Sequence, residues 1–245
     1  MSVRKVYRIS GQDAREFLQN LVTNDVNRAD AGLVWAALLT PQGKYLADFF
    51  LLADDGSVLL DVAEPLAAGL VQRLAMYKLR ADVVIEETDL CVEQGYGELP
   101  PGAFPDPRDT SLGWRRYGDL ALAPDDWEAR RIAALVPESG IELIPNETFP
   151  LEAGFERLNG VDFKKGCYVG QEVTARMKHK TELRKGLALV EVSQIAPVGT
   201  EIANGAGKSV GRLYSQAAGL GLAHIRFDRV DRAMSAGEAS VSIRS

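Results

Sequence analysis

The character of the sequence changes near Gly186, and this change limits what the chain can fold into. Upstream, apolar residues alternate between the spacing of strands and the spacing of helices. Downstream, short β-rich runs are separated by turn signals such as Asn204-Gly205 and Ala218-Gly219. Closely spaced short strands are typical of a small barrel or sandwich. We therefore predict an α+β region over residues 1–185 and a C-terminal β-barrel domain over residues 186–245. The expected barrel strands are Leu187–Val192, Glu201–Ile202, Ser209–Ser215, Leu220–Ile225 and Val241–Ile243.

The region before Gly186 begins with the pattern strand, helix, three strands, helix, strand. Residues Val3–Ile9 are β-rich and alternate, and Ser10 is placed to cap a helix whose apolar face holds Phe17 and Leu21. This order resembles a ferredoxin-like split unit. The later strands are expected at Trp35–Leu39, Lys44–Leu52, Val58–Val62 and Ala81–Glu87, with a helix from Pro65 between the last two.

Four further segments follow before the central loop. Leu90–Glu93 is expected to form a strand that carries Cys91 among apolar neighbours. The proline-rich residues 100–107 disfavour regular structure and predict a loop. A hairpin is expected around Gly118-Asp119, and the acids near Asp125 suit the start of a helix that runs to about Leu135.

Charge and cysteine content exclude several classes of protein. The 245 residues carry a net charge of −6, which argues against a protein that coats nucleic acid. No run of about 18 apolar residues is present, so we expect no membrane span. Cys91 and Cys167 form no Cys-x-x-Cys pair, which fits a reducing compartment. His179 and His224 are not spaced to complete a metal-ligand set with them, so no metal site is expected.

The most unusual segment is Lys164–Lys185, which is basic within an acidic chain. It holds seven Lys and Arg residues against two acids. Such a positive segment suggests an anionic ligand, although a solvated helix face is the simpler explanation of the charge alone. Gly166 and Gly170 flank Cys167 and permit backbone conformations that a Cβ would forbid. Gln171–Lys178 is then expected to be a helix.

Cys167 is the candidate reactive group of this segment. Lys164, Lys165 and the positive end of the following helix would favour its thiolate. A thiolate can act as a nucleophile, a redox sensor or a soft-metal ligand, whereas a buried cysteine acts as a small apolar residue, which is the reading we favour for Cys91. One cysteine cannot hold an iron–sulfur cluster, which needs about four ligands. No phosphate-binding glycine loop is present, and a pair of catalytic carboxylates remains an open alternative.

These residues resemble a known family. Lys165-Gly-Cys-Tyr-Val-Gly-Gln-Glu172 is similar to the K-G-C-[FY]-x-G-Q-E signature of the YgfZ-type folate-binding proteins, whose eukaryotic counterparts act in mitochondrial iron–sulfur cluster assembly. The family is related to the glycine cleavage T-protein, a tetrahydrofolate-dependent aminomethyltransferase. Supporting matches are Phe17-Leu-Gln-Asn-Leu-Val-Thr-Asn-Asp25, Pro41-Gln-Gly-Lys44 followed by Asp48, Tyr77-Lys-Leu-Arg80 and Arg131-Ile-Ala133.

The resemblance implies a T-protein-like cloverleaf of ferredoxin-like lobes and a small C-terminal β-barrel around a folate channel. It implies tetrahydrofolate or a derivative as cofactor, and iron–sulfur assembly proteins or client iron–sulfur enzymes as partners, with no nucleic acid and no membrane. Cys167 is then the essential thiol and Lys165 its electrostatic partner. The expected location is the cytoplasm of a bacterium or the mitochondrial matrix of a eukaryote, since no secretory or transit segment is evident at the N-terminus. The candidate folate-binding residues are Asp48, Trp127, Tyr168, Gln171, Glu172 and Arg176.

Two functions other than an accessory role in cluster assembly stay open at this point. The first is a folate-dependent aminomethyltransferase or other one-carbon transferase. Ala47-Asp48 stands where the T-protein has two aspartates, which weakens that reading, while Leu151-Glu-Ala-Gly154 is similar to a T-protein segment and supports it. The second is an interaction module in which Lys178 and Lys180 dock an acidic carrier protein.

Overall fold

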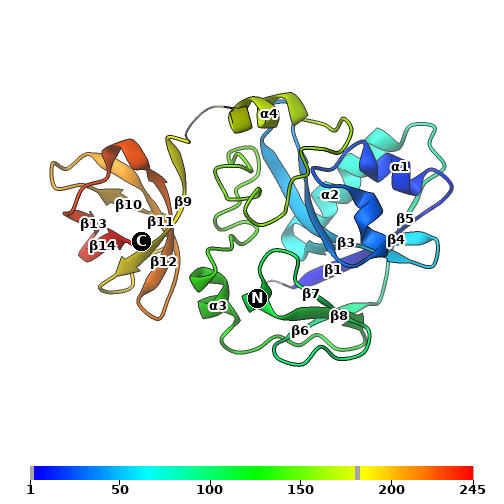
Figure 1. The fold of residues 1–245 in the computed structure, drawn as a ribbon, viewed down its shortest axis with the longest axis horizontal. Coiled ribbons are helices and arrows are strands. Elements are labelled where there is room, and N and C mark those ends of the chain that lie inside the picture. Colours follow the sequence, from blue (N-terminus) through cyan, green and yellow to red (C-terminus); the bar gives the residue numbers. More distant parts are fainter. Residues whose placement is uncertain (1–2, 180–182, 245) are drawn as a thin grey trace.

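The computed structural model describes residues 3–179 and 183–244 and divides them among three sheets (Figure 1). Two of the sheets belong to the α+β region, and the third is a closed barrel at the C-terminal end of the chain. The α+β fold with a small terminal barrel is therefore as predicted. No helix in the described ranges is long and apolar enough to cross a bilayer.

The first sheet contains five antiparallel strands in the order β2-β3-β4-β1-β5. Without β2, the order β3-β4-β1-β5 is that of a ferredoxin-like split unit, so β2 is an additional edge strand. The strands are β1 (Arg4–Ser10), β2 (Val34–Leu39), β3 (Tyr45–Asp54), β4 (Ser57–Ala63) and β5 (Val84–Glu87).

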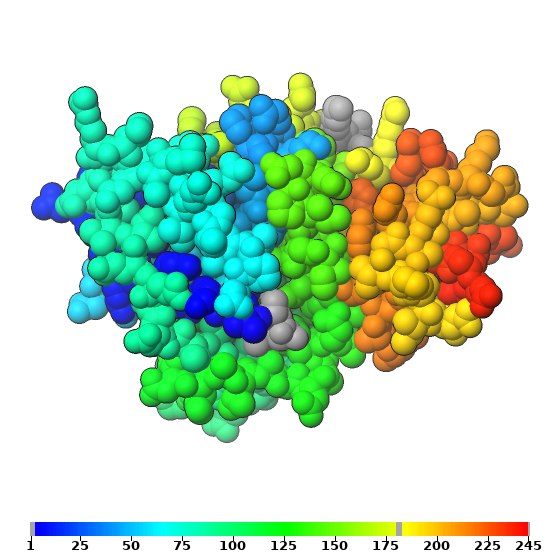
Figure 2. All heavy atoms as spheres, turned by 180° about the vertical axis from the view of Figure 1, so that it is seen from behind, coloured from blue at the N-terminus to red at the C-terminus, as the bar shows by residue number. Residues whose placement is uncertain are grey.

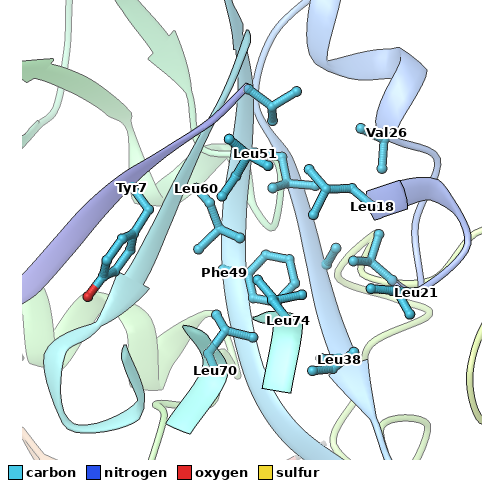
Figure 3. Close-up of a cluster of buried hydrophobic side chains, with 14 of the residues drawn as sticks. Tyr7, Leu18, Leu21, Val26, Leu38, Phe49, Leu51, Leu60, Leu70 and Leu74 are labelled. Atoms are coloured by element: carbon cyan, nitrogen blue, oxygen red, sulfur yellow. The ribbon is translucent and has the colours of Figure 1, made fainter. Parts of the chain in front are cut away.

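Both faces of this sheet are buried, which is why β2 is continuously apolar and β3 is apolar over most of its length. Successive side chains of a strand point to opposite faces. Leu38 and Phe49 pack with helices α1 (Ala14–Gln19) and α2 (Glu64–Lys78), as Figure 3 shows for this core. Trp35 and Phe50 pack on the other face. That second core also contains Leu143, Phe155, Leu158, Val161 and Tyr168 from the later loop.

Helix α1 begins later than the sequence suggested. Ser10 was expected to cap it, but the strand continues to Ser10, and the turn at Gly11 (φ +106°) delays the helix until Ala14. A Cβ at Gly11 would lie 2.2 Å from the carbonyl oxygen of Asp82. Glycine is therefore required where the chain leaves β1 and passes close to the segment before β5.

The second lobe is a three-stranded sheet in the order β6-β8-β7, with helix α3 (Trp127–Ala133) after it. The predicted hairpin around Gly118-Asp119 is wrong, because β8 is bonded to β6 on one side and to β7 on the other. β7 lies in the proline-rich segment that we expected to be a loop, and its proline stands at an edge of the sheet, where a missing N–H is tolerated. The strands are β6 (Cys91–Gly95), β7 (Ala103–Pro105) and β8 (Trp114–Gly118).

A buried carboxylate joins the first sheet to the second lobe. Asp61 on β4 is fully buried, and its oxygens lie 2.6 Å from Arg4 Nε and 3.1 Å from Arg115 Nη1. The Tyr117 hydroxyl donates to the same carboxylate. Strands β1, β4 and β8 therefore share one set of charge-assisted hydrogen bonds, which are stronger than neutral ones.

The C-terminal barrel closes in the order β10-β11-β12-β9-β14-β13. Its inward-facing residues form a core of their own, with Val190, Leu213 and Ile225 fully buried. β9 begins at Lys185, beside the predicted domain boundary. The strands are β9 (Lys185–Val192), β10 (Thr200–Ala203), β11 (Ser209–Ala217), β12 (Leu220–Arg226), β13 (Met234–Ala236) and β14 (Ala239–Ile243). Short 3₁₀ helices cover Val26–Asp30, Thr110–Leu112 and Phe227–Arg229.

Arg131 on α3 connects the barrel to the rest of the molecule. Its side chain is completely buried, and Nη1 donates to the carboxylate of Glu142 at 3.2 Å and to the carbonyl of Val136 at 3.0 Å. Nη2 donates to the hydroxyl of Ser215 on β11, whose backbone N–H donates to Glu142 at 3.1 Å. Figure 2 shows the green segment that contains these residues between the first sheet and the barrel.

Replacing Arg131 by methionine is expected to destabilise the protein strongly, because the buried carboxylate of Glu142 loses its cation. Breaking one partner of a buried pair costs about 3–5 kcal/mol. Urea unfolding followed by circular dichroism measures this loss. The matched control is Arg130→Met, whose half-exposed side chain pairs with Asp126 across one helical turn and should contribute less than about 0.5 kcal/mol. Equal losses in the two variants would contradict this role for Arg131.

Candidate functional site

The loop that carries Cys167 is held by the ammonium group of Lys165. Its Nζ donates to the carbonyls of Gln19 at 2.7 Å, Val22 at 2.5 Å and Asn24 at 3.0 Å. These carbonyls surround the C-terminal end of α1, where backbone acceptors have no helical partner and a cation is favoured. Burial lowers the pKa of Lys165 to about 8, against the opposing effect of Asp25 and Asp162. The ammonium group therefore ties the loop to α1.

Thr23 and Asn24, from the Thr-Asn-Asp motif after α1, bind the start of the same loop. The Thr23 hydroxyl donates to the carbonyl of Gly160 at 2.6 Å and accepts the N–H of Ala37. The Asn24 amide donates to the carbonyls of Trp35 at 2.8 Å and Asn159 at 2.6 Å. Both side chains are buried, so their hydrogen bonds are protected from water.

The Pro-Gln-Gly turn touches the other end of the loop through two glycines. Gly43 and Gly170 both have positive φ, +75° and +84°. A Cβ on Gly170 would lie 2.6 Å from the carbonyl oxygen of Thr40, and a Cβ on Gly43 would lie 2.8 Å from Cβ of Val173. The structure thus brings together three motifs that lie far apart in the sequence, at residues 17–25, 41–44 and 165–172.

Cys167 is exposed at the centre of this clamped loop. Gly166 beside it is also exposed, while Tyr168 is buried and lies under Lys165, whose Nζ is 5.2 Å from its ring centroid. Burial raises the pKa of the Tyr168 hydroxyl. Cys91, in contrast, is half-buried on β6. The loop therefore presents one thiol to solvent on a backbone that is fixed on both sides.

Helix α4 (Gln171–His179) follows the thiol directly, as predicted. Glu172 and Arg176 are exposed, Gln171 is half-buried, and Thr174 is buried with its hydroxyl bonded to the carbonyl of Gly170. Lys178 pairs with Glu156. Lys180, the other cation of the predicted carrier-docking surface, lies outside the described residues.

Asp48 lies in the interior of the first lobe, on β3. Only 3% of it is exposed, and its carboxylate accepts hydrogen bonds from Trp35 Nε1 at 2.9 Å and from the hydroxyls of Tyr45 and Ser139, both at 2.6 Å. Burial and this carboxylate raise the pKa of Tyr45. The structure therefore places Asp48 among three donors of the chain itself.

Trp127 is also buried, with 3% of its surface exposed, and its side chain belongs to the second core. Its indole N–H has no hydrogen-bond partner among the described residues. The predicted folate-binding residues are thus divided between two places. Tyr168, Gln171, Glu172 and Arg176 lie with Cys167, whereas Asp48 and Trp127 lie in the interior.

A large cleft of about 1140 Å³ opens between the α+β region and the barrel. Met177 of α4 lines it, so the cleft adjoins the helix that follows the thiol. Glu152, from the Leu-Glu-Ala-Gly segment, lies in its wall with Lys185 Nζ at 3.3 Å and His224 Nε2 at 3.4 Å. Further charged residues of the lining are Glu147, Arg184, Glu201, Arg212 and Arg226.

Most of these cleft residues were absent from the sequence-based candidates. His224, Arg212 and Arg226 come from adjacent barrel strands that pair in antiparallel register. Their spacing in the sequence resembles no motif, so no local signal identifies them. Glu152 stands in a segment that we had noted, but its place in a cleft depends on the docking of the barrel. No group of three or more His, Cys, Asp or Glu side chains in the described ranges is arranged to hold a metal ion.

Known proteins resemble this chain along most of its length. Residues 184–245 match the family model for the CAF17 C-terminal beta-barrel domain. The human mitochondrial iron–sulfur cluster assembly factor IBA57 is 30% identical, over 93% of this chain and 76% of the relative. The mitochondrial IBA57 homologue of Mycosarcoma maydis is 34% identical, over 74% of this chain and 54% of the relative, so the chain spans about half of that protein's length.

A solved structure has the same fold. The glycine cleavage system aminomethyltransferase T from Bartonella henselae aligns with a TM-score of 0.75, over 99% of this chain and 83% of that one. The sequence identity is 14%, so the likeness concerns the fold. The predicted T-protein-like architecture is confirmed.

Gly170→Ala is expected to destabilise the Cys167 loop, because alanine is disfavoured at positive φ and its Cβ would meet the carbonyl of Thr40. The left-handed conformation alone costs a non-glycine residue roughly 1–2 kcal/mol, so we expect thermal unfolding to show a loss of at least about 2 kcal/mol. Gly166→Ala is the matched control, because no atom lies within 4 Å of its Cβ position. A Gly170→Ala variant as stable as Gly166→Ala would show that the two loops are not in this contact.

Proposed function

Because the chain belongs to the IBA57 family of iron–sulfur cluster assembly factors, we propose that it takes part in the assembly or repair of iron–sulfur clusters. The relation to the human protein covers both the α+β region and the barrel, which supports a shared role. The residue-level observation that supports the proposal is the exposed thiol of Cys167. It lies on a loop that two distant motifs, at residues 17–25 and 41–44, hold in place.

Cys167 is the group that would contact the cluster. A single thiol supplies one ligand of the about four that a cluster needs, so the remaining ligands must come from a second protein. The neighbouring Lys164 is also exposed, so a partner that meets the thiol would meet a cation beside it. The partners of this site are therefore iron–sulfur assembly proteins or client enzymes that hold the cluster from the other side.

We further propose that a reduced folate binds this protein in the large cleft. The interior residues Asp48 and Trp127 do not fit a direct contact, since Asp48 already accepts three hydrogen bonds and both are buried. The cleft fits better. Its volume of about 1140 Å³ exceeds the usual size of a small-molecule site, and its lining combines the carboxylate of Glu152 with arginines.

Individual cleft residues match the two ends of a folate. Glu152 could accept hydrogen bonds from the N–H groups of the pterin ring, as carboxylates do. Arg212 and Arg184 have no ion-pair partner among the described residues and would attract the carboxylates of the glutamate tail. A bound tetrahydrofolate would supply nitrogen atoms that carry one-carbon units. The adjoining helix α4 then links the folate cleft to the thiol, because Met177 lines the cleft and Gln171 follows the loop.

The proposed location follows the relatives. They are named as mitochondrial proteins, so the matrix is the proposed site of action in a eukaryote and the cytoplasm in a bacterium.

Aminomethyl transfer is the less favoured activity. The aminomethyltransferase shares the fold at 14% identity, and the carboxylate of Asp48 on β3 already accepts hydrogen bonds from side chains of this chain.

A Cys167→Ala variant is expected to fail in restoring the activity of iron–sulfur enzymes in cells that lack this protein. The loss should approach that of cells with no protein at all, because no second exposed thiol exists in the described chain. Enzyme activities of cluster-containing proteins in extracts provide the measurement. Cys91→Ala, at the half-buried cysteine, is the control and should restore activity. Full restoration by Cys167→Ala would exclude the thiol from the function.

Isothermal titration with 5-formyl-tetrahydrofolate is expected to give saturable binding that Arg212→Glu weakens by about tenfold or more, as expected for loss and reversal of a carboxylate partner. Lys208→Glu is the matched control, because it reverses the charge of an exposed residue on the same barrel that does not line the cleft. Wild-type-like affinity of Arg212→Glu would place the ligand elsewhere, and absence of saturable binding would remove folate from the proposal while leaving the role of Cys167 intact.

A further inference from the structure

A second hollow lies beside α1 and is not part of the site described above. It has a volume of about 430 Å³ and runs between α1 and the end of α2. Phe17 and Leu21 form its floor with Tyr77 and Ala81, and the carboxylates of Asp13 and Glu16 stand at its edge. No Lys or Arg is among the residues that line it.

Exposed apolar residues lie next to the groove-lining Tyr77 and Ala81 in the sequence, interspersed with Lys78 and Arg80. Met76 is 71% exposed and Leu79 is 88% exposed, and Tyr77 and Val84 are also open to solvent. Single exposed apolar residues are common, but a cluster next to a groove marks an interaction surface. Methionine in particular adapts its shape to different partners. The exposed area extends beyond the groove, so it suits a protein segment better than a small molecule.

The backbone at Leu79 adds an independent observation. Leu79 ends α2 with φ +44° and ψ −101°, a conformation that a residue with a Cβ rarely adopts. Strained backbone of this kind costs about 1–3 kcal/mol and concentrates at functional positions. At this position the strained backbone exposes the side chain of Leu79 to solvent, where it is not part of the hydrophobic core.

The acidic residues at the edge of the groove indicate which kind of protein segment would bind there. In the part of the chain that the structure describes, neither Asp13 nor Glu16 lies within ion-pair distance of a cation. The Asp13 carboxylate also accepts a hydrogen bond from the backbone N–H of Asp82 at 2.8 Å. Two acidic side chains at the edge of an apolar groove favour a partner that presents Lys or Arg beside an apolar side chain.

The groove also adjoins the thiol loop. Leu21 lines the groove, while the carbonyls of Gln19 and Val22 on either side of it hold the ammonium group of Lys165. A protein seated in the groove would therefore contact the same short segment that anchors the Cys167 loop.

We propose that the groove between α1 and the end of α2, together with Met76, Tyr77 and Leu79, is a docking surface for a basic segment of another protein that inserts an apolar side chain. This inference stands on the groove alone and does not require the thiol or a folate to act as proposed.

The test uses the full-length protein and a fluorescein-labelled amphipathic peptide of leucine and lysine, followed by fluorescence anisotropy. Leu79→Asp and Glu16→Lys are each expected to weaken binding by about tenfold, as for residues that anchor and orient a contact. Ile195→Asp and Glu191→Lys are the matched controls, because both residues are exposed on the barrel, and they should change affinity by less than about twofold.

A second peptide, with serine in place of leucine, separates apolar docking from simple attraction to an acidic protein. It should bind at least about tenfold more weakly than the leucine peptide. Equal binding of the two peptides, equal effects of Leu79→Asp and Ile195→Asp, or no binding by the wild type would each overturn the proposal. Light scattering tests whether the groove instead binds a second copy of this chain. A dimer that dissociates in the Leu79→Asp variant would show that it does.

Discussion

The buried guanidinium of Arg131 determines how the two halves of the molecule meet. It is the point at which α3, the carboxylate of Glu142 and the barrel residue Ser215 share hydrogen bonds, all without contact with water. Because a guanidinium has donors in a fixed planar arrangement, it sets direction as well as distance. The cleft lies along this junction, and Glu142 contributes to its lining. The shape of the cleft thus depends on a buried contact at its wall.

The Cys167 loop follows the same principle on a smaller scale. Its position depends on Lys165, Thr23 and Asn24, none of which is exposed, and on the close approach of Gly43 and Gly170. Buried polar groups with all their partners present define a single arrangement. The exposed part of the site is therefore small, and most of the characteristic sequence around it serves to hold the backbone rather than to meet a ligand.

Much of the architecture could be predicted from local patterns, and the failures have identifiable physical causes. Helix α2 and the barrel strands follow from periodicity, because each buries a regular apolar face, whereas β2 and β3 follow from apolar runs that are buried on both faces. The false hairpin at Gly118 arose because a turn signal cannot show that both edges of β8 are already paired. The cleft residues His224 and Arg212 could not be predicted, because they face Glu152 across one cleft, with His224 in contact with it, only after the barrel docks. Asp48 was recognised as special from its motif, but its burial depends on Ser139, which lies 91 residues further along the chain.

The second face of the first sheet has a consequence for synthesis of the chain on the ribosome. Trp35 and Phe50 are covered by Phe155, Leu158 and Tyr168, and the Thr23 hydroxyl bonds a carbonyl 137 residues away. The strands of the N-terminal sheet can pair early. One apolar face of the sheet stays exposed to solvent until those later residues have left the ribosome. At about 5–20 residues per second, this exposed interval lasts several seconds. The nascent chain is therefore a natural client for chaperones that bind apolar surfaces, whereas the barrel, whose strands are all local in sequence, forms without such a delay.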